Sequence, residues 1–379
     1  MQGPKNALKT LRAHRRALHR IPEMANHEFQ TKDALLSALR ALKPDLLRCY
    51  GGTGIKAVFF CGKEGAKTLG FRADMDALPV EEKTCLPFCS QNPGFMHACG
   101  HDGHMALLLT FLGFVSAKRL ELPHNIAAIF QPGEENLLGA RDMVRAGILE
   151  DPRVDEIYGL HVMPSYRAGT IGLSAGPVMA GNTSLDIRVI GKSAHGAAPH
   201  LGVDSILAAS QVVLSLEARL TRLSAEEPSL LTFGQIAGGV VRNQLAGETT
   251  LRGTLRYFSL KRRDELHRVI AESSSAAAAV FGAKAEVLFD ERQYPPVVND
   301  AAVVSKALPL LPEGVLVPQP RQMIAEDFSC YLNERPGFFA FAGVGRGESD
   351  APLHSDRFSF DEEALLPALD FYIRLAQNP

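Results

Sequence analysis

The chain of 379 residues is nearly neutral, because its 40 lysine and arginine residues face 42 acidic residues, and 46% of its residues are hydrophobic. A chain of this length can bury a large core and is long enough for two domains. No basic block stands out that could neutralise a row of phosphates, so nucleic acid is not an expected partner. Apolar stretches such as 125–130 and 337–344 are too short to span a bilayer, and the N-terminus lacks an apolar signal core. We therefore expect a cytoplasmic protein with no membrane partner.

The cysteines give a second indication of this location. The six residues are scattered through the chain: Cys49, Cys61, Cys85, Cys89, Cys99 and Cys330. A chain this large does not need disulfides to stabilise its fold, so we expect most of the thiols to be reduced. Apart from Cys99, each is interpreted as a small buried apolar residue.

The first part of the chain has the pattern of helices and buried strands. Helical spacing of apolar residues predicts helices over 5–20 and 31–42, which end before Pro44. Continuously apolar runs predict strands buried on both faces, with a connecting helix over 105–120. These strands are expected over 54–60, 68–72, 125–130 and 155–162. Strands covered by helices in this way indicate an α/β sheet.

The pattern changes after a stretch rich in glycine and proline at 164–177, which is typical of a domain boundary. Alternating apolar and polar residues then predict half-exposed strands over 184–190, 230–236 and 249–257, and helices over 205–220 and 262–281. A β-α-β-β-α-β order with half-exposed strands describes a small open-faced sandwich.

After Tyr294-Pro295-Pro296 the first pattern returns, with a strand over 338–344 and a closing helix over 361–375. The predicted fold class is therefore α/β, with a discontinuous first domain whose mixed sheet is covered by helices and an inserted βαββαβ domain. We expect the first domain at 1–180 and 291–379 and the inserted domain at 181–290.

Residue types that bind metals follow the predicted strands of the first domain. Strand 68–72 is followed by Asp74 and Asp76, strand 125–130 by Glu134-Glu135, and strand 155–160 by His161, while the loop after 338–344 carries His354. In open α/β sheets the ligand site lies beyond the carboxyl ends of the strands. Segments far apart in sequence are therefore expected to converge on one site.

The segment Met96-His97-Ala98-Cys99-Gly100-His101-Asp102-Gly103-His104 is the clearest candidate for a metal site. A thiolate and an imidazole two residues apart suit a transition metal. A structural zinc site commonly uses four such ligands with more cysteines, whereas this segment has one cysteine and the carboxylates lie elsewhere. The composition therefore favours a catalytic site with an open coordination position.

The neighbouring carboxylates Glu134 and Glu135 can take two different roles in a metallohydrolase. One can coordinate the cation while the other takes a proton from water. Asp74 and Asp76 stand at i and i+2 on a turn, so one of them can orient a ligand histidine. Which of the two does so is left open.

These residues resemble the M20 metallopeptidase and amidohydrolase family, in particular its aminoacylase and hippurate-hydrolase branch. The matching segments lie in order along the whole chain: FRADMDALPV at 71–80, MHACGHDGHM at 96–105, FQPGEE at 130–135, GLHVMP at 159–164, GKSAHGAAPH at 191–200, AEDFS at 325–329 and HSDRFSFDEEAL at 354–365. The resemblance implies an α/β catalytic domain that binds one or two divalent ions, two per subunit being our expectation. It also implies an inserted ferredoxin-like lid domain that forms a homodimer or a dimer-based tetramer.

Roles are carried over from the resemblance residue by residue. The implied metal ligands are Cys99, His101, Glu135, His161 and His354. Glu134 is the implied general base, and Asp76 aligns with the residue that orients a ligand. Asp74 stands where related peptidases have a histidine ligand, and Cys99 replaces that ligand, so a softer site is expected. Manganese is the family-like choice, with zinc, nickel and cobalt as alternatives.

In the inserted domain, His195 resembles a histidine that reaches the partner subunit's active site and stabilises the oxyanion. Asn243 and Arg256 resemble the groups that bind the substrate's carbonyl and carboxylate. One departure affects this region: relatives carry a proline shortly after the asparagine, whereas this chain has Gln244-Leu245-Ala246-Gly247.

The predicted activity is hydrolysis of an N-acyl amino acid or a similar small amide. A dipeptidase or aminopeptidase of the same family is the alternative among enzymes. A catalytically inactive metal-binding protein, or a redox sensor in which Cys99 is the reactive thiol, is the alternative from another class. The sequence does not specify the acyl group or the amino acid, because motifs do not report pocket shape.

Overall fold

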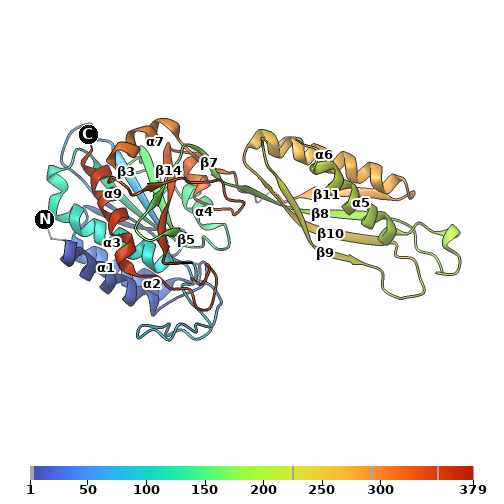
Figure 1. Ribbon diagram of the computed structural model, residues 1–379, viewed down its shortest axis with the longest axis horizontal. Helices are drawn as coiled ribbons and strands as arrows, with labels where there is room; N and C mark the ends of the chain where they lie inside the picture. Colours follow the sequence, from blue (N-terminus) through green and yellow to red (C-terminus); the bar gives the residue numbers. More distant parts are fainter. Residues whose placement is uncertain (1–3, 224–225, 291–292, 348–349, 379) are drawn as a thin grey trace. The chain divides into compact units, whose positions relative to one another are not determined.

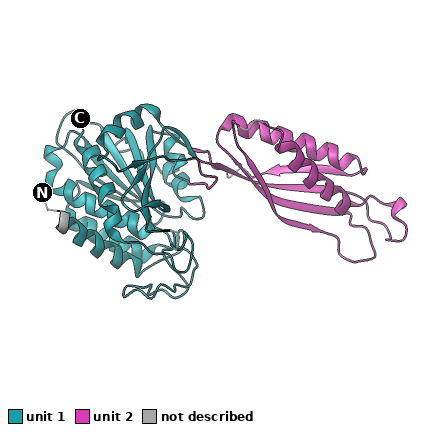
Figure 2. Cartoon of the chain, viewed as in Figure 1, with its two compact units in different colours: residues 1–178, 298–320, 327–379 teal, residues 179–297, 321–326 magenta. Residues whose placement is uncertain are grey.

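The computed structural model describes residues 4–223, 226–290, 293–347 and 350–378. The chain divides into two compact units, shown in Figure 2. Unit 1 comprises residues 1–178, 298–320 and 327–379, and unit 2 comprises residues 179–297 and 321–326. The short segment 321–326 was not expected to belong with the inserted residues. The predicted boundary at residue 291 lies outside the described residues.

Unit 1 has a mixed sheet, as the sequence predicted, and its eight strands have the order β1-β2-β4-β3-β5-β14-β6-β13. Figure 1 labels β3, β5 and β14 of this sheet. Its strands are β1 (Leu46–Tyr50), β2 (Gly54–Phe59), β3 (Thr68–Asp74), β4 (Asn125–Gln131), β5 (Glu156–Arg167), β6 (Ile171–Gly172), β13 (Leu316–Val317) and β14 (Gly337–Gly345). The four central strands β4, β3, β5 and β14 run parallel, so their carboxyl ends meet at one edge. A separate pair joins β7 (Gly176–Met179) to β12 (Val297–Asn299).

Helices lie on both faces of this sheet. They are α1 (Pro4–His19), α2 (Phe29–Leu42), α3 (His101–Lys118), α4 (Gly139–Arg145), α7 (Ala301–Ala307), α8 (Ser329–Leu332) and α9 (Leu366–Gln377). Phe71 on β3 packs against Phe111 of α3 and Tyr372 of α9. The next residue, Arg72, points to the opposite face and lies over Phe328 at the start of α8. Because helices cover both faces of the sheet, every residue of β2, β3 and β14 is buried.

Several elements differ from the sequence-based expectation. Strand β1 and the short strands β6, β7, β12 and β13 were not predicted, because two to five residues carry little periodicity. Helix α3 begins at His101, four residues before the predicted start, with Gly100 in a left-handed conformation as its N-cap. The polar residues of the first turn hid this start, and they are buried rather than exposed.

Unit 2 has a four-stranded antiparallel sheet in the order β11-β8-β10-β9. Along the chain its elements are β8 (Gly181–Ile190), α5 (Ser205–Leu220), β9 (Leu230–Gly238), β10 (Glu248–Tyr257), α6 (Leu260–Ala279) and β11 (Lys284–Phe289). Leu185, Ile187 and Val189 of β8 form a core with residues of α5 and α6, and the residues between them face the other side of the sheet. The order of elements is therefore β-α-β-β-α-β, with helices on one face only.

Within the described residues, no helix has the length and apolar character that a membrane crossing requires. All six cysteines carry free thiols.

Candidate metal centre and active site

The predicted metal ligands of unit 1 lie together at the carboxyl ends of the parallel strands. Among the groups of side chains whose ligand atoms lie within 4.8 Å of one another, three consist only of predicted ligands and the predicted base: Cys99 with His101 and His161, Cys99 with Glu135 and His354, and His101 with Glu134 and Glu135. The sulfur of Cys99 is 3.4 Å from Nε2 of His161. Nε2 of His354 is 3.5 Å from Oε1 of Glu135. The arrangement brings all five predicted ligands and the predicted general base into one cluster.

Tight packing holds the Cys99 segment in place. Gly100 has a φ of 86°, and a Cβ atom there would lie 2.4 Å from the side chain of Val162. The first turn of α3 packs in the same way against the C-terminal loop, because a Cβ atom on Gly103 would lie 2.6 Å from the ring of Phe360. Only glycine permits both the backbone conformation and this approach to β5 and the C-terminal loop.

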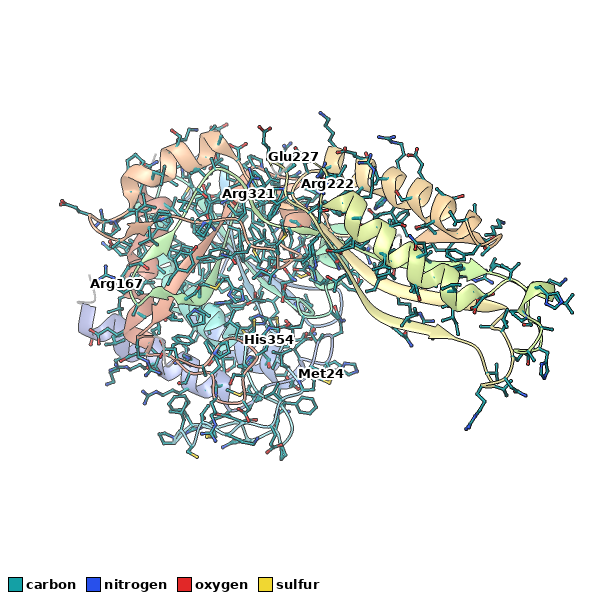
Figure 3. All side chains as sticks on the ribbon, turned by 45° about the vertical axis from the view of Figure 1, so that its right-hand side comes forward. Met24, Arg167, Arg222, Glu227, Arg321 and His354 are labelled. Carbon is teal, nitrogen blue, oxygen red and sulfur yellow. The ribbon has the colours of Figure 1, made fainter. Side chains whose placement is uncertain are left out.

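The C-terminal loop carries His354, labelled in Figure 3, to the same place. The backbone N–H of His354 donates a hydrogen bond to the carbonyl oxygen of Ala98 at 2.8 Å. His354 has a φ of 67° and is exposed, whereas Cys99, His101 and His161 are buried. One face of the cluster is therefore open to solvent.

Asp76 organises the site through both its backbone and its side chain. Its backbone carbonyl oxygen accepts a hydrogen bond from Nδ1–H of His101 at 2.9 Å. Its carboxylate accepts hydrogen bonds from the backbone N–H groups of Glu134 and Glu135, at 3.1 and 2.9 Å. Asp76 thus fixes the His101 tautomer with Nε2 free and also positions the loop after β4.

Asp74 takes part in a different, buried network. Arg72 donates to Asp74 at 2.6 Å, and Nδ1–H of His104 donates to the other carboxylate oxygen, also at 2.6 Å. Nε2 of His104 in turn accepts the backbone N–H of Val162 at 2.9 Å. Both ring nitrogens of His104 therefore form hydrogen bonds, and the side chain links β3 to β5.

Of the two remaining histidines, His161 has a ring nitrogen that faces the cluster, whereas His97 does not belong to it. Nδ1–H of His161 donates to the carbonyl oxygen of Val162 at 2.7 Å, so that Nε2 is free and faces Cys99. His97 is buried, and it belongs to none of the candidate metal-binding groups found among the described residues. Burial lowers the pKa of His97 to about 4.

The cluster fits a divalent cation by its unsatisfied atoms and by its charge. Nε2 of His101 and Oε1 of Glu135 are buried without a hydrogen-bond partner. Burial disfavours protonation of His101, yet attraction to Asp74 and the other nearby carboxylates raises its pKa to about 10. Burial and the carboxylates Glu135 and Glu134 also hold the pKa of the Cys99 thiol well above its usual value. The negative charge that favours a proton on His101 is the charge that a bound cation would compensate in its place.

Four further buried residues near the site, Glu28, Asp102, Arg15 and His19, were given no role from the sequence. Glu28 accepts the backbone N–H of Gly133, the residue before Glu134, at 2.9 Å. Asp102, in the first turn of α3, is held by Arg15 at 3.0 Å and by His19 at 2.8 Å. The signal that could have found them is an acidic or basic side chain inside an otherwise buried helical face.

The residues predicted to bind substrate all lie in unit 2. The loop carrying Asn243 is adjacent to His195, because the carbonyl oxygen of Asn243 accepts the backbone N–H of Gly196 at 2.8 Å. Both side chains are exposed. Arg256 lies separately, on β10.

Comparisons with known proteins identify the family of the chain. A sequence profile of Peptidase family M20/M25/M40 matches residues 70–378. The N-acetyldiaminopimelate deacetylase of Exiguobacterium sibiricum is 36% identical over 369 residues, which cover 95% of this chain and 97% of the relative. The N-acetyl-L-cysteine deacetylase of Bacillus subtilis is 34% identical over 372 residues, which cover 96% of this chain and 86% of the relative.

Two solved structures are similar over nearly the whole chain. A putative aminohydrolase from methicillin-resistant Staphylococcus aureus has a TM-score of 0.92 and 29% identity, and the match covers 99% of this chain and 97% of that protein. A dinuclear metal-binding peptidase of the M20 family from Bacillus subtilis has a TM-score of 0.87 and 31% identity, with 98% of each chain covered. The chain described here belongs to the peptidase family M20/M25/M40.

Proposed function

We propose that this protein is a metal-dependent amidohydrolase that removes the acyl group of N-acyl amino acids or similar small amides. The observation that carries the proposal is the cluster in which Glu134 lies beside Cys99, His101, Glu135, His161 and His354. Two relatives covered over most of their length are named as deacetylases of N-acetylated amino acids, which supports the same reaction class.

We propose two divalent cations per subunit, and manganese in preference to zinc, nickel or cobalt. The grouping of side chains supports two cations because Cys99 belongs to one group with His101 and His161 and to a second with Glu135 and His354. A related protein is described as dinuclear, which agrees with this count. When bound, the cations polarise the acyl carbonyl and lower the pKa of water at the site.

In the proposed reaction Glu134 is the general base. It accepts a proton from the attacking water and delivers it to the leaving nitrogen. The Asp76 carboxylate accepts a hydrogen bond from the backbone N–H of Glu134 and so positions this residue. Its side chain is largely buried, with 7% exposure, so the proton is transferred away from bulk solvent.

We propose that unit 2 is a ferredoxin-like lid through which the protein forms a homodimer, or a tetramer built from dimers. Its βαββαβ order and the exposed edge strand β9 support this role. In the proposed dimer, His195 donates a hydrogen bond to the oxyanion of the partner's substrate. Asn243 contacts the substrate carbonyl, and Arg256 binds the free carboxylate through two parallel hydrogen bonds. Six free thiols support the proposed cytoplasmic location.

The burial of Cys99 argues against a redox sensor. The side chain is 6% exposed, and burial raises the pKa of the thiol well above its usual value. A sensor cysteine needs an accessible thiolate. Its place in two candidate ligand groups supports a metal ligand instead, since a bound cation would favour the thiolate.

The test is a hydrolysis screen with manganese over acetyl, benzoyl and aminoacyl derivatives of amino acids. We expect turnover of acetyl or benzoyl substrates, whereas turnover of aminoacyl substrates alone would indicate a dipeptidase. Glu134→Ala should abolish turnover and retain the bound metal, measured by elemental analysis. Normal activity in this variant would show that the assignment is wrong.

A further inference from the structure

Asp74 lies at the end of β3, close to the proposed metal ligand His101. Its Oδ2 atom is 3.7 Å from Nε2 of His101, the ring nitrogen that the contact with the Asp76 carbonyl leaves available. Two ligand atoms that bind one cation at about 2.1 Å in a tetrahedral arrangement are about 3.4 Å apart. Asp74 also belongs, with His101 and His104, to a group whose ligand atoms lie within 4.8 Å of one another. By distance alone, Asp74 could therefore bind the same cation as His101.

Both carboxylate oxygens of Asp74 already accept hydrogen bonds. Nη1 of Arg72 donates to Oδ2 at 2.6 Å, and Nδ1–H of His104 donates to Oδ1 at the same distance. Hydrogen bonds between a guanidinium and a carboxylate are commonly about 2.7–2.9 Å long, so the contact with Arg72 is a close one. The oxygen of Asp74 that lies near His101 is therefore the oxygen that the guanidinium holds.

Arg72 cannot turn away from Asp74 without losing its other contacts. Its Nε donates to Oε1 of Gln131 at 2.7 Å, and its Nη2 donates to Oδ1 of Asp327 at 3.1 Å. Gln131 and Asp327 are themselves joined, because Nε2 of Gln131 donates to both Asp327 oxygens, at 2.8 and 2.9 Å. Arg72 is 2% exposed, so bulk water does not replace these partners. The network thus fixes the guanidinium in its contact with Asp74.

We propose that Arg72 influences which cation the metal centre prefers, because it withholds Asp74 from the metal. Carboxylates favour hard cations such as manganese, whereas thiolate and imidazole ligands favour softer cations such as zinc. While Arg72 holds Asp74, Glu135 is the carboxylate among the proposed ligands, beside Cys99 and three histidines. The proposed preference for manganese is therefore weaker than it would be with Asp74 as an additional ligand.

Arg72 acts through Asp74 and is therefore a positioning residue. The inference rests on the metal centre of the proposed function and adds a residue that controls its choice of cation. Its test measures metal affinity, which a purely structural role of Arg72 would not shift in favour of one cation.

The test compares Arg72→Met, Asp74→Asn and the double variant R72M/D74N with the wild type. Competition between the metal-free protein and a chromophoric chelator gives the affinity for manganese and for zinc. Methionine offers no donor to Asp74, so R72M should raise the affinity for manganese relative to zinc by about tenfold or more, as is typical of changes beside a metal ligand. D74N should keep the wild-type ratio of the two affinities. R72M/D74N should return to that ratio, because the added carboxylate is gone.

Arg335→Met is the matched control. Arg335 is a partly buried arginine that contacts Glu150 and donates to the carbonyl oxygen of Val154, before β5 begins. Its replacement removes a paired arginine from unit 1 and should leave the ratio of the two affinities unchanged.

Three outcomes would overturn the inference. They are an unchanged ratio in R72M, a raised ratio that persists in R72M/D74N, and a changed ratio in D74N alone, which would show that Asp74 binds the metal in the wild type. Circular dichroism checks folding, because R72M leaves two buried carboxylates without their cation. If R72M does not fold, R72M/D327N replaces it, since this pair of changes keeps the net charge of the network. The same rise is expected, and an unchanged ratio would reject the inference.

The inference and the proposed function can fail separately, because these affinities do not depend on turnover. A wild type that binds both cations but hydrolyses no acylated amino acid would refute the proposed function and leave the role of Arg72 standing. A wild type that binds neither cation would refute both.

Discussion

Oε1 of Glu28 accepts a hydrogen bond from the backbone N–H of Gly133 at 2.9 Å, across 105 residues of sequence. Its second oxygen accepts the hydroxyl of Thr53 at 2.6 Å. Burial raises the pKa of Glu28. Since Gly133 directly precedes Glu134, a residue near the N-terminus fixes the loop that carries the proposed general base.

Replacing Glu28 by alanine should therefore lower both stability and turnover. The backbone N–H of Gly133 and the hydroxyl of Thr53 would be left buried without an acceptor, at a cost of about 1–3 kcal/mol for each group. We expect a lower free energy of unfolding in urea, and a kcat lower by about tenfold because the base is misplaced. Glu64→Ala, at an exposed turn, is the control and should change neither quantity. Wild-type kcat in E28A would contradict the positioning role.

The same loop closes on Gly139, where α4 begins. A Cβ atom on Gly139 would lie 1.6 Å from the carbonyl oxygen of Pro132, a backbone atom that cannot move away cheaply. Gly139→Ala should destabilise the protein by more than about 2 kcal/mol and displace Glu134. Gly113→Ala in α3 is the matched control, because a Cβ there meets nothing within 4 Å, and it should add about 0.5–1 kcal/mol of stability. Equal unfolding curves for the two variants would refute this account of the loop.

Metal content should respond differently to changes at Cys99 and His354. Cys99 belongs to two of the candidate ligand groups, whereas His354 belongs to one. We expect Cys99→Ala to lose most of the metal that the wild type retains after desalting, and His354→Ala to lose about half of it, because only one position is affected. Elemental analysis of the purified variants measures this. Wild-type metal content in C99A would exclude the shared-ligand arrangement.

Stability should fall at alkaline pH through His19. Burial disfavours the charged imidazole, but the hydrogen bond and charge of Asp102, with a second hydrogen bond from Glu82, raise the pKa of His19 to about 9. A folded-state pKa above the unfolded value of about 6.5 stabilises the fold below that pH, and the contribution is lost as pH rises through about 9.

The comparison variant is His19→Gln, which removes the titrating group. Between pH 6.5 and 9 the stability of the wild type relative to H19Q should decrease by on the order of 3 kcal/mol. Urea unfolding at several pH values measures the difference. If the two proteins show parallel pH profiles across this window, His19 is not charged in the folded state.

The mixed α/β sheet and the positions of the reactive residues after its strands could be predicted from the sequence. Buried parallel strands are continuously apolar, and their carboxyl ends share one edge, so periodicity alone predicted that Asp76, Glu134, His161 and the His354 loop converge. Which imidazole nitrogens have no hydrogen-bond partner depends on contacts between distant segments of the fold. His101 and His104 are three residues apart on one helix, yet a carbonyl of Asp76 leaves Nε2 of His101 available, whereas Asp74 and Val162 occupy both nitrogens of His104. Local sequence cannot distinguish them, because each partner comes from a strand or loop at least 25 residues away.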